Sequence, residues 1–166
     1  IEAADRILKT AETELLFAKA GCPGKYYILF SGEVAAVSSS LEAGRETGGA
    51  HVVDSVVIPS VHPMVISAIN QAVEPVPVNA LGVMEFFSVT ASVLAADAAV
   101  KAAEVDLMDV RLGTGIGGKS FVILSGDVAA VHEAVEAGIR TASENGLLVS
   151  QVVIPNPKAE IFNSLL

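Results

Sequence analysis

Two stretches of the chain decide its fold: GKYYILFSGEVAAVSSSLEAG at residues 24–44 and GKSFVILSGDVAAVHEAVEAG at residues 118–138. Of these 21 aligned positions, 11 are identical. The matches outside this core are Asp5 with Asp97, Lys9 with Lys101, and residues 56–59 with residues 152–155. The chain is therefore a tandem duplication of one structural unit.

The second copy is complete. Segments whose apolar residues are spaced as in a strand alternate along it with segments whose apolar residues are spaced as in a helix. Strands are predicted over residues 81–87, 105–112, 121–125 and 147–154. Ser88 or Thr90 is expected to cap a helix ending near Ala103, and Asp127 a second helix ending near Gly146. A short tail helix is expected over residues 157–165. The order βαββαβ predicts an α/β (α+β) domain of ferredoxin-like type, with one sheet and two helices.

The first copy begins at Ile1, the equivalent of Val93, so the sequence given holds no counterpart of residues 80–92 before it. It also lacks an initiator Met, and we expect the sequence to be trimmed at its N-terminus. The predicted division is a first domain over 1–73, incomplete at its N-terminus, a linker over 74–79, and a second domain over 80–166. Two prolines in the linker disfavour both helix and central strand.

Composition argues against several functional classes. The net charge is −9 and no Lys/Arg cluster is present, whereas nucleic-acid binding requires basic residues that replace counterions. The longest uncharged run, residues 55–73, contains Pro59 and Pro63, so we expect strand, turn and short helix there and not a membrane span. A single Cys with no visible signal peptide indicates a reducing compartment.

The only thiol lies in a short loop between two strand-like runs, residues 15–20 and 26–31. That loop reads Gly21-Cys22-Pro23-Gly24-Lys25, and its counterpart reads Gly115-Ile116-Gly117-Gly118-Lys119. The ordinary alternative for a free Cys is an inert core residue. A core Cys is expected inside an apolar run, however, and not between Gly and Pro.

The succession of motifs resembles the bacterial microcompartment (BMC) shell domain. It comprises LGVMEFFSV at 81–89, AADAAVKAA at 95–103, GGK at 117–119 and SGDVAAV at 125–131. Two fused copies make the chain similar to tandem-domain shell proteins, whose trimers imitate hexameric tiles. CPGK in the first loop and GIGGK in the second resemble the iron–sulfur type, known best from the propanediol-utilisation compartment.

The resemblance implies roles for individual residues. The loop before Gly-Lys lines the central pore in this family, which places there Gly21, Cys22, Pro23, Gly24, Gly115, Ile116, Gly117 and Gly118. Cys22 is the implied metal ligand, binding a [4Fe–4S] cluster that three chains share. The implied tile-edge residues are Lys9 and Lys101.

The resemblance also implies partners and a location. The expected partners are two further copies in a homotrimer, other BMC shell proteins at the tile edges, and an encapsulated redox enzyme. Neither nucleic acid nor a membrane is implied, and the location is the microcompartment shell in the cytoplasm. The protein is not expected to be an enzyme.

Physical chemistry supports a cluster that several chains share, and two alternative functions remain open. Iron–sulfur clusters usually need four thiolates, so one Cys per chain is too few. A three-fold axis would bring three copies of Cys22 together and leave the fourth iron for water or a small ligand. The first rival is a shell tile whose pore passes metabolites without a cluster. The second is a cytosolic trimer that senses a small molecule.

Other motifs carry less weight. Residues 113–120 match the GxxxxGKS pattern of a phosphate loop, but a strand follows where such a loop requires a helix. The spacing of His51, His62 and His132 does not fit a metal site. The acids Glu85, Asp106 and Asp109 are scattered along strands and form no pair for acid–base chemistry.

Overall fold

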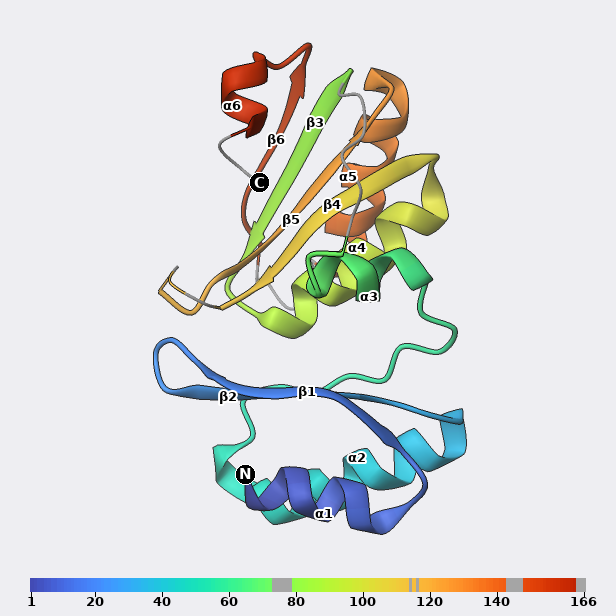
Figure 1. Ribbon diagram of the computed structural model, residues 1–166, viewed down its shortest axis with the longest axis vertical. Helices are drawn as coiled ribbons and strands as arrows, with labels where there is room; N and C mark the ends of the chain where they lie inside the picture. Colours follow the sequence, from blue (N-terminus) through green and yellow to red (C-terminus); the bar gives the residue numbers. More distant parts are fainter. Residues whose placement is uncertain (73–78, 114, 116, 143–147, 164–166) are drawn as a thin grey trace. The chain divides into compact units, whose positions relative to one another are not determined.

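The computed structural model describes residues 1–72, 79–113, 115, 117–142 and 148–163 (Figure 1). It consists of two compact units, Ile1–Ser60 and Val61–Leu166, each described below by itself. The predicted linker over 74–79 falls almost wholly outside the described residues, and the predicted domain boundaries stay predictions.

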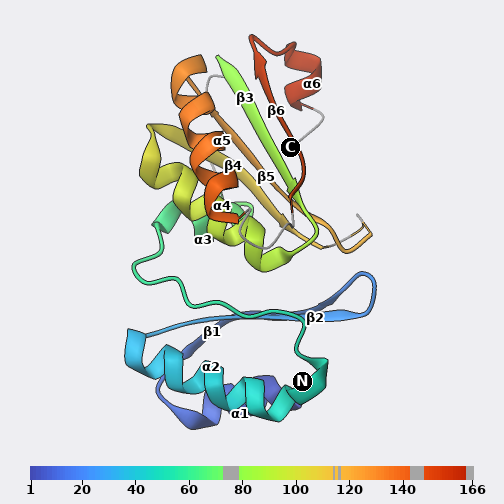
Figure 2. The ribbon, with the colours of Figure 1, turned by 180° about the vertical axis from the view of Figure 1, so that it is seen from behind.

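The second unit contains a four-stranded antiparallel sheet covered on one face by two helices (Figure 2). The strand order is β4-β5-β3-β6. The strands are β3 (Ala80–Phe86), β4 (Val105–Leu112), β5 (Ser120–Gly126) and β6 (Leu148–Pro155), and the helices are α4 (Val89–Ala102) and α5 (Val128–Ala142). The predicted βαββαβ order is confirmed for this copy.

Small residues let the helices lie close to the sheet. A Cβ at Gly138 in α5 would lie 2.8 Å from Met84 Sδ and 2.9 Å from the Ala95 carbonyl oxygen. A Cβ at Gly82 would similarly meet side chains from β5 and α5. Ser88 caps α4, because its hydroxyl accepts the Ala91 N–H at 3.4 Å. The predicted end of the second helix near Gly146 lies outside the described residues.

The first unit contains the remaining elements of the duplicated fold. They are α1 (Glu2–Thr10), β1 (Glu14–Gly21), β2 (Lys25–Ser31), α2 (Val34–Gly48) and the 3-10 turn η1 (Gly49–His51). The two strands form an antiparallel hairpin with a bulge between Leu15 and Phe17, and β4 has a bulge between Leu107 and Asp109. Because these bulges lie at matching positions of the two copies, the duplication extends to backbone detail.

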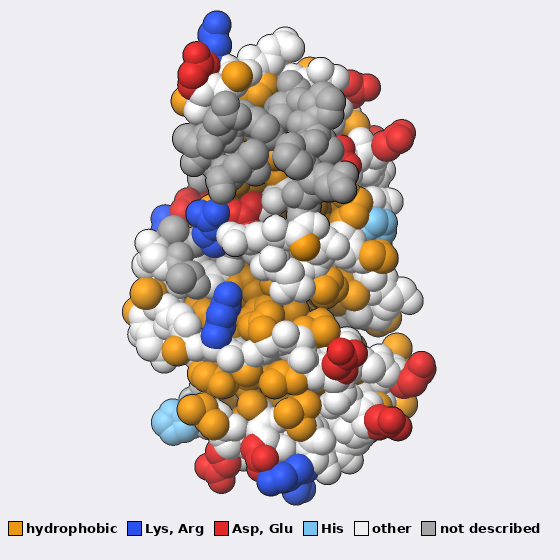
Figure 3. All heavy atoms as spheres, in the orientation of Figure 1, with side chains coloured by type: hydrophobic (Ala, Val, Ile, Leu, Met, Phe, Trp, Pro, Cys, Tyr) orange, Lys and Arg blue, Asp and Glu red, His pale blue; other side chains and the backbone are white. Residues whose placement is uncertain are grey.

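The strand expected near residues 56–59 is not formed, so that prediction is wrong. The corresponding residues of the second copy lie in β6, which pairs with β3. The sequence given holds no counterpart of β3 in the first copy. Within the described part of Ile1–Ser60, β1 and β2 pair only with each other. Hydrophobic side chains gather over this hairpin on the face seen in Figure 3, and Leu15 and Tyr26 are exposed.

Each copy ends in one short helix, and the two helices lie at matching positions after residues 56–59 and 152–155. These are α3 (Pro63–Ile69) and α6 (Ala159–Asn163), whose first residues are 96 positions apart, the same offset as residues 56–59 from 152–155. The turn and short helix expected in the uncharged run are therefore present. Among the described residues, no helix has both the length and the apolarity needed to cross a membrane.

Candidate pore loop and metal ligand

Cys22 lies exposed in the tight turn of the β1–β2 hairpin. Gly21 pairs with Lys25 across the hairpin, and the Gly24 N–H donates to the Gly21 carbonyl at 3.0 Å. Gly24 has φ +95°, a conformation that glycine adopts without steric cost. The alternative of a buried core thiol is therefore wrong, because the turn presents the Cys22 thiol to solvent.

Tyr27 holds the base of the turn. Its ring lies where a Cβ on Gly21 would stand, so any larger residue at position 21 would have to displace the ring. Its hydroxyl donates to the Cys22 carbonyl at 3.2 Å. Burial, and secondarily the nearby Cys22, raise the pKa of Tyr27. The phenol therefore stays protonated at neutral pH and keeps its role as a donor.

One chain by itself offers a single soft ligand at this turn. Among the described residues, no group of three His, Cys, Asp or Glu side chains could hold a metal ion. Because an iron–sulfur cluster usually needs four thiolates and the chain has a single Cys, one chain alone cannot supply the ligands of such a cluster.

The second loop is rich in glycine and carries no thiol. Gly113, Gly115, Gly117 and Gly118 all have φ between +65° and +77°, so each adopts the left-handed conformation. Gly115 and Gly117 are exposed, whereas Gly118 is buried. Ile116, a predicted pore residue, lies outside the described residues. The first and second loops belong to different compact units.

The base of the second loop is tied to the sheet. Lys119 Nζ lies 2.5 Å from Glu85 Oε1, and the Ser150 hydroxyl donates to the same carboxylate at 3.4 Å. Ser120 is fully buried and donates to the Ser88 carbonyl at 2.8 Å. Because Ser120 opens β5 and its hydroxyl is engaged, the GxxxxGKS pattern does not form a phosphate loop here.

The predicted edge lysines each pair with an aspartate one helical turn earlier. Lys9 Nζ lies 2.7 Å from Asp5 Oδ2, and Lys101 Nζ lies 2.6 Å from Asp97 Oδ2. The environments differ, because the Asp5 side chain is 61% exposed and that of Asp97 is 9% exposed. Asp97 also accepts the His62 backbone N–H at 2.8 Å.

Sequence reasoning missed the contact between His62 and Asp97. The sequence shows that Asp97 and Lys101 match Asp5 and Lys9 in the other copy. It does not show that Asp97 contacts His62, which lies 35 residues earlier. His62 instead serves as the N-cap of α3, with Nδ1 accepting the Met64 N–H at 3.3 Å. His51 and His132 are exposed.

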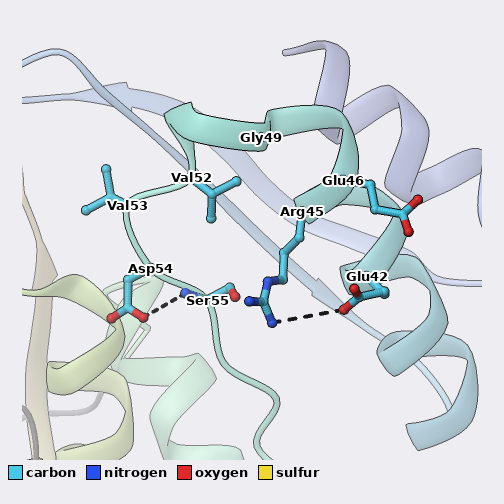
Figure 4. Close-up of a pocket in the computed structure, with 8 residues that line it drawn as sticks. All are labelled: Glu42, Arg45, Glu46, Gly49, Val52, Val53, Asp54 and Ser55. Carbon is cyan, nitrogen blue, oxygen red and sulfur yellow. Dashed lines mark hydrogen bonds and ion pairs between the residues drawn. The ribbon is translucent and has the colours of Figure 1, made fainter.

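The remaining polar features are structural. Asp109 is buried and pairs with Arg111 at 2.7 Å; burial raises its pKa, and the guanidinium partly offsets that shift. A shallow polar hollow lies between the end of α2 and residues 52–55 (Figure 4). Arg45 points toward Glu42 there, 4.0 Å away, and the Ser55 N–H donates to Asp54.

Comparisons with known proteins place both copies of the repeat in one family. The family described as the BMC domain matches residues 1–61 and 80–157. The bacterial microcompartment shell protein PduT of Citrobacter freundii is 39% identical over 165 residues, 99% of this chain and 90% of that protein. The shell protein EutM of Salmonella typhimurium is 42% identical over 84 residues, 50% of this chain and 84% of that protein.

Solved structures show the same relationship. A microcompartment protein from Desulfitobacterium hafniense has a TM-score of 0.90 and 49% identity, covering 98% of this chain and 90% of that one. The fused permuted hexameric shell protein MSM0275 has a TM-score of 0.65 and 26% identity, covering 86% of this chain and 76% of that one.

Proposed function

The chain belongs to the BMC domain family, and from that premise we propose that it forms a trimeric shell tile whose Cys22 residues jointly hold a [4Fe–4S] cluster. The family assignment makes it a structural protein of a bacterial microcompartment shell, because the relatives that cover it are named shell proteins. It is therefore a structural protein and not an enzyme, and the role that we propose for it is assembly of the shell and passage across it.

The observation that carries the cluster proposal is the exposed Cys22 thiol at the hairpin turn. Gly24 leaves room for a bulky group beside the thiol, because it is exposed and a Cβ there would meet nothing within 4 Å. Three copies supply three thiolates, leaving one iron for water or a small ligand. When bound, the cluster would supply one-electron transfer.

In this proposal the remaining loop residues surround the cluster. Pro23 and Gly24 are exposed beside the thiol, with Gly21 at the base of the turn. The second loop contributes backbone and no ligand, from Gly115, Ile116, Gly117 and Gly118. An encapsulated redox enzyme would be the electron partner. Lys119 is engaged with Glu85 and fixes the loop base.

The deciding experiment is the iron and acid-labile sulfide content of protein purified without oxygen, with its absorbance spectrum. We expect about four irons per trimer and a brown colour, as three thiolates and one open iron imply. An iron-free protein that still assembles into sheets would overturn the cluster and favour the rival pore for metabolites. Discrete trimers that never form sheets would instead favour the cytosolic sensor.

Replacing Lys9 by Glu is expected to abolish sheets and leave trimers intact, because Lys9 is the proposed tile-edge residue. Its ion pair with Asp5 is exposed, so losing it should cost the fold little. Electron microscopy would score sheets and sedimentation would score trimers. The exposed Glu2→Lys change on the same helix serves as the control and should keep sheets. Sheets that persist in Lys9→Glu would contradict the edge assignment.

Lys101 is a less suitable probe of the same idea. Its partner Asp97 is 9% exposed, so a Glu at position 101 would place two carboxylates together near the core. Lys101→Gln avoids this repulsion and is the variant to combine with Lys9→Glu.

A further inference from the structure

The β1–β2 hairpin is basic, although the chain as a whole is acidic. Between residues 15 and 32 the only charged side chains are those of Lys19 and Lys25, whereas the whole chain has a formal net charge of −9. Lys19 lies opposite Tyr27 in the β1–β2 ladder, and Lys25 lies opposite Gly21. Side chains that are directly opposite, or two residues apart on one strand, share a face of the sheet. Both lysines therefore lie on one face of the hairpin, at the end that carries the thiol.

The matching cation of the second copy is neutralised by an acid. Counted from the bulge that both hairpins share, Arg111 of β4 matches Lys19, and Asp109 matches Phe17. The Arg111 guanidinium lies 2.7 Å from the Asp109 carboxylate. Because the first copy has a Phe where the second copy has this Asp, the hairpin with the thiol lacks the acid that compensates the cation in the hairpin without one.

Lys19 instead contacts an aromatic ring. Its ammonium lies 5.1 Å from the centroid of the Phe17 ring, a cation–π contact that leaves the positive charge uncompensated. Lys19 is exposed, and in the part of the chain that the structure describes it forms no ion pair. Its neighbour across the ladder, Tyr27, donates to the Cys22 carbonyl, so the charge lies beside the turn.

We propose that Lys19 attracts anionic reactants to the Cys22 turn, and that the electron partner of the protein presents an acidic protein surface there. This inference rests on the proposed cluster, which makes the turn the place where electrons enter and leave. A trimer would bring three copies of Lys19 around the three thiolates. Positive charge at such a site raises the local concentration of anions and speeds their association. Acids elsewhere on the chain oppose this only weakly, because salt screens charges beyond about 8 Å at physiological ionic strength.

Two oxidants of opposite charge test the proposal. The trianion ferricyanide and the trication tris(phenanthroline)cobalt(III) each accept one electron from the reduced cluster, in protein purified without oxygen and reduced with dithionite. At low salt, Lys19→Glu should lower the ratio of the anionic to the cationic rate constant by about tenfold or more. Lys19→Arg keeps the charge and should keep the ratio. High salt should bring the ratios of wild type and Lys19→Glu together.

Arg6→Glu is the matched control. It makes the same change of charge at an exposed position of α1, outside the hairpin, and should leave the ratio unchanged. An unchanged ratio in Lys19→Glu, or an equal fall in both variants, would overturn the proposal. Iron content is measured in every variant, so that loss of the cluster is not mistaken for a change in charge preference.

The free thiol provides a second readout that does not need the cluster. If the protein holds no iron, the cluster proposal is wrong, and Cys22 can be tested by thiol–disulfide exchange with dithiobis(nitrobenzoate), a dianion, and cystamine, a dication. Lys19→Glu should again lower the ratio of the anionic to the cationic rate constant, and Arg6→Glu should not. An unchanged ratio in Lys19→Glu would then overturn the role of Lys19 as well.

Discussion

Cys22→Ser is expected to be colourless and free of iron when purified without oxygen, with assembly unchanged. Each chain carries one thiol, so the variant removes every thiolate from the proposed ligand set. The side chain is exposed in a hairpin turn, so the substitution removes no core packing. The measurement is iron and sulfide per trimer, beside sedimentation and electron microscopy of both proteins.

Two companion variants sharpen this result. Cys22→Ala should behave like Cys22→Ser, which excludes weak ligation by the serine oxygen. Tyr27→Phe alters the same hairpin by removing the hydroxyl that donates to the Cys22 carbonyl, yet keeps the thiol. It should retain iron. Full iron content in Cys22→Ser would show that the metal lies elsewhere.

Phe86→Ala is expected to lower the free energy of unfolding of the second unit by about 3–5 kcal/mol, the usual cost of removing a buried Phe side chain. Phe86 ends β3, the strand that pairs with both β5 and β6, and its side chain is 0% exposed. Far-ultraviolet circular dichroism during urea unfolding would measure the change.

The neighbouring Phe87 provides the control. It is 57% exposed, so Phe87→Ala should change stability by about 0.5 kcal/mol or less. The chain has no Trp, and both Tyr residues lie in the first unit, so Tyr fluorescence reports that unit separately. A similar loss of stability for the two Phe variants would mean that Phe86 is not a core side chain.

The second copy could be predicted closely because its signals are local. Strand 105–112 has the predicted bounds, and Ser88 caps α4 as one of two candidates. The prediction of a strand near residues 56–59 was wrong because a strand depends on pairing with residues far away in the sequence. Its apolar sequence suits a strand, but a strand also needs a neighbour, and the sequence given does not include a counterpart of β3 for the first copy.

In the candidate site, too, the local features could be predicted from the sequence and the long-range contacts could not. The position of Cys22 in a turn between two strands follows from its flanking glycines and strand patterns, and its exposure agrees with the Gly-Cys-Pro context. The contact between His62 and Asp97 was not predictable, because nothing in a seven-residue helix indicates which sheet it covers. A ligand set drawn from several chains also lies beyond the information in one chain.

The packing of α3 on α4 and β4 has a consequence for how the protein behaves on dilution. Covalent linkage gives a tethered segment a high effective concentration, so its binding is insensitive to dilution. Covalent linkage therefore keeps the α3 contact intact at any protein concentration, whereas contacts between separate chains remain open to mass action. A fused tile should come apart on dilution only between chains, and so into whole tandem chains.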